Sequence, residues 1–172
     1  MKTQWHTAVG FIEYAQVFED DRDMGTGGKN PNVDKAREKT DGLYKVRFYP
    51  EDEAELEKMQ GALSDPMFQG HPRWHDGDEN FGTGKYTVLQ RKHIDPSGYE
   101  DFGGAPEVVT WGSTDDEKND PWDPNNKLGN GTKVLMKYTT YGEGPGQTVR
   151  MVKIGVIDHK EYVKPELDGV MF

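Results

Sequence analysis

The densest cluster of potential ligands in the chain is the segment HPRWHDGDEN at residues 71–80. His71 and His75 are four residues apart and Asp76 follows, and imidazole and carboxylate groups of this kind bind zinc. The proline and the glycine inside the segment disfavour a helix, so a spacing of four does not bring the two imidazoles to one face. A metal-dependent enzyme that uses these three residues is therefore an alternative, and the leading prediction has no metal and no cofactor.

A second chemistry is indicated by basic residues that alternate with Tyr and Leu along residues 43–49, 85–92 and 132–141. Successive side chains of a β-strand point to opposite faces, so one face of these segments builds a core and the other collects Lys and Arg. Lys and Arg side chains neutralise phosphates, and aromatic rings stack on unpaired bases. Single-stranded nucleic acid offers both groups. Basic residues on an open sheet face are also ordinarily solvated, so the pattern alone leaves both interpretations open.

Strands are the elements expected to position these side chains. The β-branched and aromatic content predicts long strands over residues 7–18, 43–49, 85–92, 132–141 and 147–162. The last two strands and the turn between them predict a β-hairpin.

The rest of the chain is predicted to be one helix and several loops. Pro50 is expected to open the helix, whose apolar stripe is Leu56, Met59 and Leu63. The other segments are a polar loop or frayed helical turn at 29–40, a loop at 64–84 and a long acidic insertion at 95–127 with a short strand at 107–111.

The composition favours a single mainly β domain that does not enter a membrane. The 172 residues include 21 Gly, 10 Pro and no Cys, which disfavours a helix bundle and excludes disulfides. No apolar run approaches the roughly 18 residues of a transmembrane helix.

The net charge of −10 would by itself argue against a polyanionic ligand, but the charges are segregated. Residues 51–80 carry nine acidic and two basic residues, and residues 99–126 carry eight acidic and one basic. Residues 127–160 carry six basic and two acidic residues. Because a ligand meets the local potential, the net charge does not exclude single-stranded DNA.

Several motifs resemble the single-stranded-DNA-binding proteins of tailed bacteriophages. Trp122 and Asp123 precede the sequence LGNGTKV at residues 128–134, which is similar to a turn before the central hairpin of that family. The sequence FGGAPEVV at residues 102–109 looks like the Gly-Gly-Pro/Ala-Pro segment of the same proteins. The resemblance is best over residues 81–162 and is looser over residues 1–60, where the order strand, strand, helix agrees.

The resemblance implies a five-stranded OB-fold, a Greek-key barrel with one helix after the second strand, long acidic loops and a short C-terminal tail. It also implies no catalysis, a domain over residues 1–162 and a flexible tail over 163–172. In the turn at residues 129–131, glycine would supply positive φ angles and allow a close approach.

The implied function is to bind and protect single-stranded DNA during phage replication or recombination, in the cytoplasm of an infected bacterial host. The terminal Phe172 fits a family tail that recruits phage replication proteins, although only two acidic residues occur in the last seven. A homodimer is left open. The residues predicted to contact DNA are Lys45, Arg47, Tyr49, Lys85, Arg91, Lys133, Lys137, Tyr141 and Lys153, with Trp111 as a stacking platform.

Two further alternatives involve no nucleic acid. One is a phage structural or protein-interaction module whose sheet face binds another protein. The other is an OB-fold inhibitor or adaptor of a host factor, because a fold alone does not determine a function.

Overall fold

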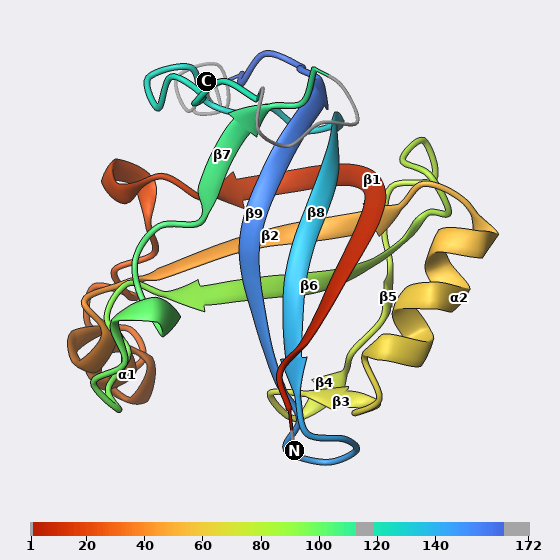
Figure 1. Ribbon diagram of the computed structural model, residues 1–172. Coiled ribbons are helices and arrows are strands. Elements are labelled where there is room, and N and C mark those ends of the chain that lie inside the picture. Colours follow the sequence, from red (N-terminus) through yellow and green to blue (C-terminus); the bar gives the residue numbers. More distant parts are fainter. Residues whose placement is uncertain (1, 113–118, 164–172) are drawn as a thin grey trace, which may run out of the picture.

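The structure is a computed structural model that describes residues 2–112 and 119–163 (Figure 1). It is mainly β, as predicted, with two α-helices and two short 3-10 helices in the described residues. The elements are β1 (Gln4–Gln16), η1 (Glu19–Asp21), α1 (Pro31–Thr40), β2 (Leu43–Pro50), α2 (Glu53–Ala62), β3 (Met67–Phe68), β4 (His71–Pro72), β5 (His75–Asp76), β6 (Lys85–Lys92), η2 (Glu100–Phe102), β7 (Glu107–Thr110), β8 (Thr132–Tyr141) and β9 (Thr148–Asp158).

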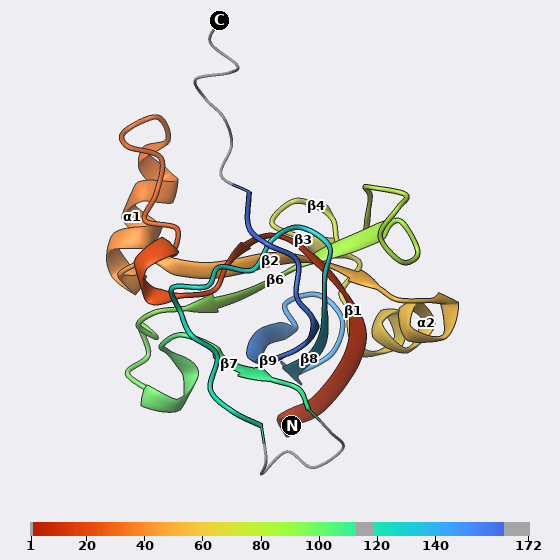
Figure 2. The ribbon, with the colours of Figure 1, turned by 90° about the horizontal axis from the view of Figure 1, so that it is seen from above.

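Seven strands form one mixed sheet in the order β5-β6-β2-β1-β8-β9-β7, in which only the β7–β9 pair is parallel. β1 belongs to both halves, because its N-terminal part pairs with β8 and its C-terminal part pairs with β2. The strand curves strongly between them, so β2 and β6 run across β8 and β9 (Figures 1 and 2). The sheet therefore has two outward faces that share β1.

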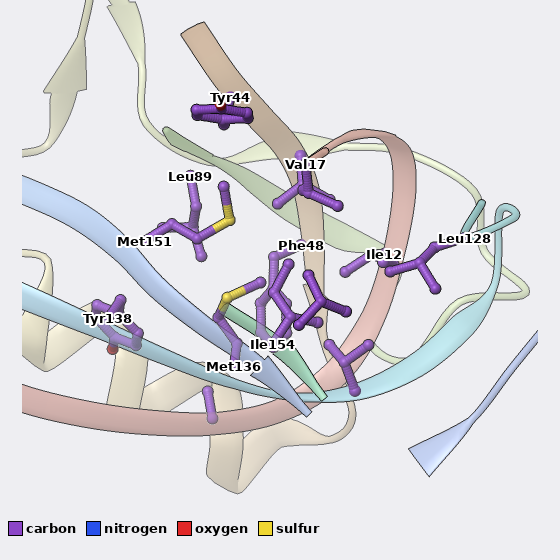
Figure 3. Close-up of a cluster of buried hydrophobic side chains, with 14 of the residues drawn as sticks. Ile12, Val17, Tyr44, Phe48, Leu89, Leu128, Met136, Tyr138, Met151 and Ile154 are labelled. Carbon is purple, nitrogen blue, oxygen red and sulfur yellow. The ribbon is translucent and has the colours of Figure 1, made fainter. Parts of the chain in front are cut away.

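The core lies between the two halves of the sheet (Figure 3). Phe48 and Leu89 come from the β2–β6 side and Met136 and Ile154 from the β8–β9 side, and all four are fully buried. Burial of such a side chain stabilises the fold by about 1.5–3 kcal/mol. The helix α2 adds the predicted apolar stripe, whose three members are all buried: Leu56, Met59 and Leu63.

The sheet is not closed into the predicted barrel. Among the described strands no backbone ladder joins β6 to β9, and the sheet ends at β5 and β7. The Arg91 side chain of β6 bridges this seam instead, because its Nη1 donates a hydrogen bond to the carbonyl oxygen of Met151 on β9 (3.3 Å). The same guanidinium also donates to the carbonyl oxygens of Asp101, Gly103 and Gly104.

Both α-helices begin at asparagine or aspartate caps. Residues 31–40 form the regular helix α1, not a loop or a frayed turn, because the Asn30 side chain accepts hydrogen bonds from the first amides and Pro31 starts the helix. The helix α2 begins at Glu53 with Asp52 as its cap, three residues later than predicted. Pro50 still belongs to β2, where it pairs with Gly10.

The described part of the chain contains no helix with both the length and the apolar character needed to cross a membrane.

Candidate nucleic-acid interface

A row of four planar side chains lies on the outer face of β1, β2, β6 and β5. The guanidinium carbon of Arg47 lies 4.8 Å from the ring centroid of Tyr14 and 4.6 Å from that of Tyr86. The His75 ring stacks on Tyr86, with centroids 5.2 Å apart and an interplanar angle of 27°. We call these four residues the stacking face. Tyr14 is 60% exposed, so the row is open to a further planar group at that end.

Strand register brings the row together. Glu13, next to Tyr14 in β1, lies opposite Arg47 of β2, and Arg47 lies opposite Val88 of β6. Tyr86 is two residues before Val88 and so shares its face of β6. His75 in turn lies opposite Tyr86. The row therefore runs across four adjacent strands, each of which supplies one planar group.

A buried carboxylate holds Arg47 in place. Glu13, which is 8% exposed, accepts a hydrogen bond from Nη1 of Arg47 (3.2 Å) and another from the Tyr49 hydroxyl (2.8 Å). The Tyr49 hydroxyl in turn accepts a hydrogen bond from the amide of Asp78 (3.1 Å). Burial, reinforced by the nearby Glu13 carboxylate, raises the pKa of Tyr49 to about 12, so the hydroxyl stays a donor at neutral pH.

Tyr14 lies in a β-bulge with an unusual backbone conformation. The pairing of β1 with β2 shifts between Glu13 and Gln16, and Tyr14 has φ = 52°. Its amide donates a hydrogen bond to Oδ1 of Asn130 (2.8 Å). Because a bulge sets two residues against one, both Glu13 and Tyr14 reach Arg47.

The turn at residues 129–131 has the properties predicted for its glycines. Gly131 has φ = 91°, and its amide donates to the carbonyl oxygen of Ile12 (2.8 Å). A Cβ atom on Gly129 would lie 2.0 Å from the carbonyl oxygen of Glu161, so this position has no room for a side chain.

A second group of predicted contacts lies on the outer face of β1, β8 and β9, which we call the lysine face. Lys137 lies opposite Lys153 and also opposite Thr7 of β1. Trp5, two residues before Thr7, is 64% exposed. The lysine face consists of Trp5, Lys133, Lys137, Tyr141 and Lys153. Carboxylates lie near two of its cations, since Lys133 is 3.5 Å from Glu51 and Lys153 is 3.9 Å from Glu107.

The predicted contacts Lys45 and Lys85 are paired with carboxylates. Lys45 lies on the outer face of β2, two residues before Arg47, whereas Lys85 begins β6 on the side of the strand that buries Thr87 and Leu89. The Lys45 ammonium is 3.1 Å from Oδ2 of Asp23, and the Lys85 ammonium is 2.9 Å from Oδ1 of Asp76. Burial alone would raise the pKa of Asp23, but a hydrogen bond from the Gly25 amide and the nearby cations outweigh it and lower the pKa. The hydrogen bond from Lys85 likewise lowers the pKa of Asp76. Both carboxylates are therefore ionised at neutral pH and compete with phosphate for these lysines.

Two other predicted contacts, Tyr49 and Arg91, are placed inside the fold or against it. Tyr49 is fully buried beneath the stacking face, in ring contact with Phe81 and Tyr86. Arg91 lies opposite the buried Tyr44, on the inward side of β6, with its guanidinium held by the backbone carbonyls of the seam. Alternation alone assigned these residues to an open face, although both sides of a strand can be covered. We therefore leave Tyr49 and Arg91 out of the candidate interface.

Trp111 is only partly exposed, and its ring packs on the backbone of β9. A Cβ atom on Gly155 would lie 2.9 Å from this ring, so the glycine makes room for it. Phe172, predicted to bind a partner, lies outside the described residues.

The three side chains of the alternative metal site have separate environments. His75 belongs to the stacking face, Asp76 is bonded to Lys85, and His71 is exposed on β4. Over residues 2–112 and 119–163, no group of three or more His, Asp or Glu residues is arranged to hold a metal ion.

Sequence reasoning missed three members of the stacking face: Tyr14, Tyr86 and His75. Tyr14 was assigned to a regular strand, and a single sequence does not reveal the bulge that reorients it. The sequence around His75 indicates only a metal ligand. Tyr86 did carry a signal, because it alternates with Val88 and Gln90 on the face of β6 that lies opposite the outward residues of β2.

Comparisons with known proteins give one structural neighbour. No family model matches the chain, and no curated protein matches it. Among solved structures, it is similar to a C-terminally truncated single-stranded DNA-binding protein from bacteriophage Enc34, with a TM-score of 0.47 and 9% sequence identity. The match covers 92% of this chain and 86% of that one. The neighbour is thus a bacteriophage single-stranded DNA-binding protein, the class that the sequence motifs resemble.

Proposed function

We propose that the protein binds single-stranded DNA with little sequence preference, through the stacking face. The observation that carries the proposal is the row of Tyr14, Arg47, Tyr86 and His75, which is open at Tyr14. Every base has a π-face, so an exposed ring next to a guanidinium accepts any base of an unpaired strand. Nη1 of Arg47 already donates to Glu13, and stacking itself does not select one base.

Single strands suit this site better than a duplex. The bases of a duplex are already stacked on each other, so a ring on a sheet surface does not reach their faces. A duplex is usually read by a helix in the major groove. Neither α-helix suits that role, since α1 has mixed charge and α2 carries Glu53, Glu55 and Glu57 against Lys58 alone.

The finer predictions belong to the same proposal. The five long strands follow the order β6-β2-β1-β8-β9, and we regard this arrangement as a partly open OB-fold. A non-enzymatic role in phage replication or recombination, in the cytoplasm of an infected host, remains a prediction. So do the division into a domain and a tail, a homodimer and the recruitment of replication proteins by the tail.

The test is a titration with fluorescently labelled oligo-dT at two salt concentrations, with Tyr14→Ala compared with Tyr99→Ala. The two tyrosines are equally exposed, at 60% and 62%, but Tyr99 lies beside η2, away from the stacking face. Stacking on one ring is worth about 1–3 kcal/mol, so Tyr14→Ala should weaken binding roughly fivefold to 150-fold. Tyr99→Ala should bind like the wild type.

Three results would contradict the proposal. They are no binding of dT at low salt, equal affinity of the two variants, or a matching duplex that binds as tightly as dT. A protein partner whose binding does not depend on salt, together with no dT binding, would favour the protein-interaction module instead.

A further inference from the structure

Tyr14 has a backbone conformation that a bulky residue rarely adopts. Among the described non-glycine residues only Tyr14, Asp41 and Gln69 have positive φ angles. Asp41 is the left-handed cap of α1, and Gln69 lies in the turn between β3 and β4. Tyr14 instead lies within a long strand. A left-handed conformation costs a non-glycine residue of the order of 1–3 kcal/mol, so the surrounding structure must hold it.

The holding contact comes from a turn 116 residues away. The side-chain oxygen of Asn130 accepts a hydrogen bond from the Tyr14 amide at 2.8 Å. The ladder of β1 with β8 ends at the pair Ile12 and Thr132, so the Tyr14 amide lies beyond it and takes its acceptor from the Asn130 side chain. One side-chain oxygen therefore both satisfies the amide and fixes the bulge.

The turn is itself anchored on both sides. The Gly131 amide donates to the carbonyl oxygen of Ile12 in β1 (2.8 Å), and the Gly129 amide donates to the carbonyl oxygen of Lys160 (2.8 Å). The absent side chain of Gly129 lets the backbone at residue 161 approach closely. Asn130 is thus presented to the bulge by a turn that is hydrogen-bonded on both sides.

We propose that Asn130 is a positioning residue of the stacking face, an inference that rests on the proposed function. In a regular strand Glu13 and Tyr14 would point to opposite faces. With Asn130 in place both reach Arg47, Glu13 as an ion pair and Tyr14 as a stacked ring. Asn130 therefore acts on a bound strand through the orientation of Tyr14. The turn that resembles the phage motif then contributes to binding through the stack and not through contact of its own.

The experiment compares Asn130→Ala with Asn125→Ala, an exposed asparagine of the preceding loop, in the full chain. The Asn130 variant should bind oligo-dT about 3- to 10-fold more weakly, because the ring is no longer held over Arg47 and part of its stacking contribution is lost. Asn125→Ala should bind like the wild type. In the Tyr14→Ala background, Asn130→Ala should cause no further loss, because its effect passes through the missing ring.

A second measurement tests the contact without DNA. The chemical shift of the Tyr14 amide proton should change in Asn130→Ala in the direction of a weaker hydrogen bond. It should remain near the wild-type value in Asn130→Asp, which keeps an oxygen acceptor. An unchanged resonance in Asn130→Ala overturns the inference. So does wild-type dT affinity in Asn130→Ala when Tyr14→Ala binds dT more weakly than the wild type. If dT does not bind the wild type at all, the proposed function has failed, whereas the resonance still tells whether Asn130 holds Tyr14.

Discussion

The stacking face and the lysine face share β1 but present different chemistry to a ligand. On the stacking face the cation Arg47 lies between two rings and is paired with the buried Glu13. On the lysine face the cations are lysines. Arg150 is in register with Trp5 across Thr139, but its guanidinium lies over the ring of Phe102, 4.1 Å from the centroid. A preorganised row of planar groups favours stacking, whereas a group of lysines acts mainly through counterion release.

Carboxylates lie near cations of both faces, but the distances of 3.5 Å at Lys133 and 3.9 Å at Lys153 are longer than those at Arg47 and Lys45. Carboxylates lie within hydrogen-bonding distance of Arg47 in the stacking face, of Lys45 on the same strand and of Lys85 at the start of β6. Phosphates must compete with these carboxylates, so the electrostatic gain on this face is small. We therefore expect the rings to supply most of the affinity that we propose for the stacking face.

The largest effect is expected when the centre of the row is removed. Arg47→Ala separates Tyr14 from Tyr86 and leaves the buried Glu13 carboxylate with the Tyr49 hydroxyl but without its cation. We expect oligo-dT affinity to fall about 10- to 100-fold, since two stacking contacts lose their support. Fluorescence anisotropy with labelled dT measures the loss, and circular dichroism confirms that the variant is folded.

Arg47→Lys tests whether the stacking face binds through a planar group or through charge alone. The substitution keeps the charge but removes the planar group that fits between two rings. If stacking carries binding, it should lose most of what Arg47→Ala loses. Wild-type affinity in Arg47→Lys would instead show that charge alone matters, and the two faces would then not differ in kind.

Lys137→Ala is expected to have a smaller effect on the other face. One phosphate contact fewer should reduce dT affinity about 2- to 4-fold at low salt and reduce the slope of log K against log salt by about 0.7. Arg47→Ala should lower affinity at every salt concentration with a smaller change of slope. The comparison fails if Lys137→Ala weakens binding more than Arg47→Ala does.

The sequence predicts all five long strands because each carries a local signal, although β1 starts three residues earlier and ends two earlier than predicted and β9 ends four residues earlier. β6 and β8 have the predicted bounds, and β2 extends one residue beyond them. Their alternation correctly assigns Val46 and Phe48 to the core. The sequence predicts only a loop or a frayed turn where α1 forms. Its N-cap Asn30, its first residue Pro31 and its C-cap Asp41 are helix signals, but the segment has too few apolar residues to show helical periodicity.

The candidate site was predicted only in part because it depends on long-range register. Arg47 was identified from its own strand, but its neighbours Tyr14 and Tyr86 come from two other strands. No local sequence pattern marks the bulge at Tyr14 or the absence of a ladder between the described strands β6 and β9. Nor does any local pattern mark Asn130, whose partner lies 116 residues away. Arg91 is the opposite case, a residue predicted for the site that does not belong to it. Its position in the strand favours an open face, but its guanidinium is hydrogen-bonded between β6 and β9.

A substitution beneath the stacking face should have the smallest effect on DNA binding. It should instead change how the free energy of unfolding depends on pH. Burial raises the pKa of Tyr44 and of Tyr49 to about 12, from an ordinary value of 10.0. Between about pH 10 and pH 12 the unfolded chain releases protons that the folded chain keeps. The free energy of unfolding should therefore fall as the pH rises through that window and should be fully retained below it.

Tyr49→Phe tests the part of this loss that belongs to the stacking face. The variant loses the hydrogen bonds with Glu13 and Asp78, which should cost about 1–2 kcal/mol at pH 7, and dT affinity should change less than twofold because Tyr49 has no exposed surface. Its stability should then fall less steeply above pH 10 than that of the wild type, as measured by urea unfolding at a series of pH values. A dT affinity as weak as that of Arg47→Ala would show instead that the Tyr49 hydroxyl is needed to keep Glu13, and through it Arg47, in position.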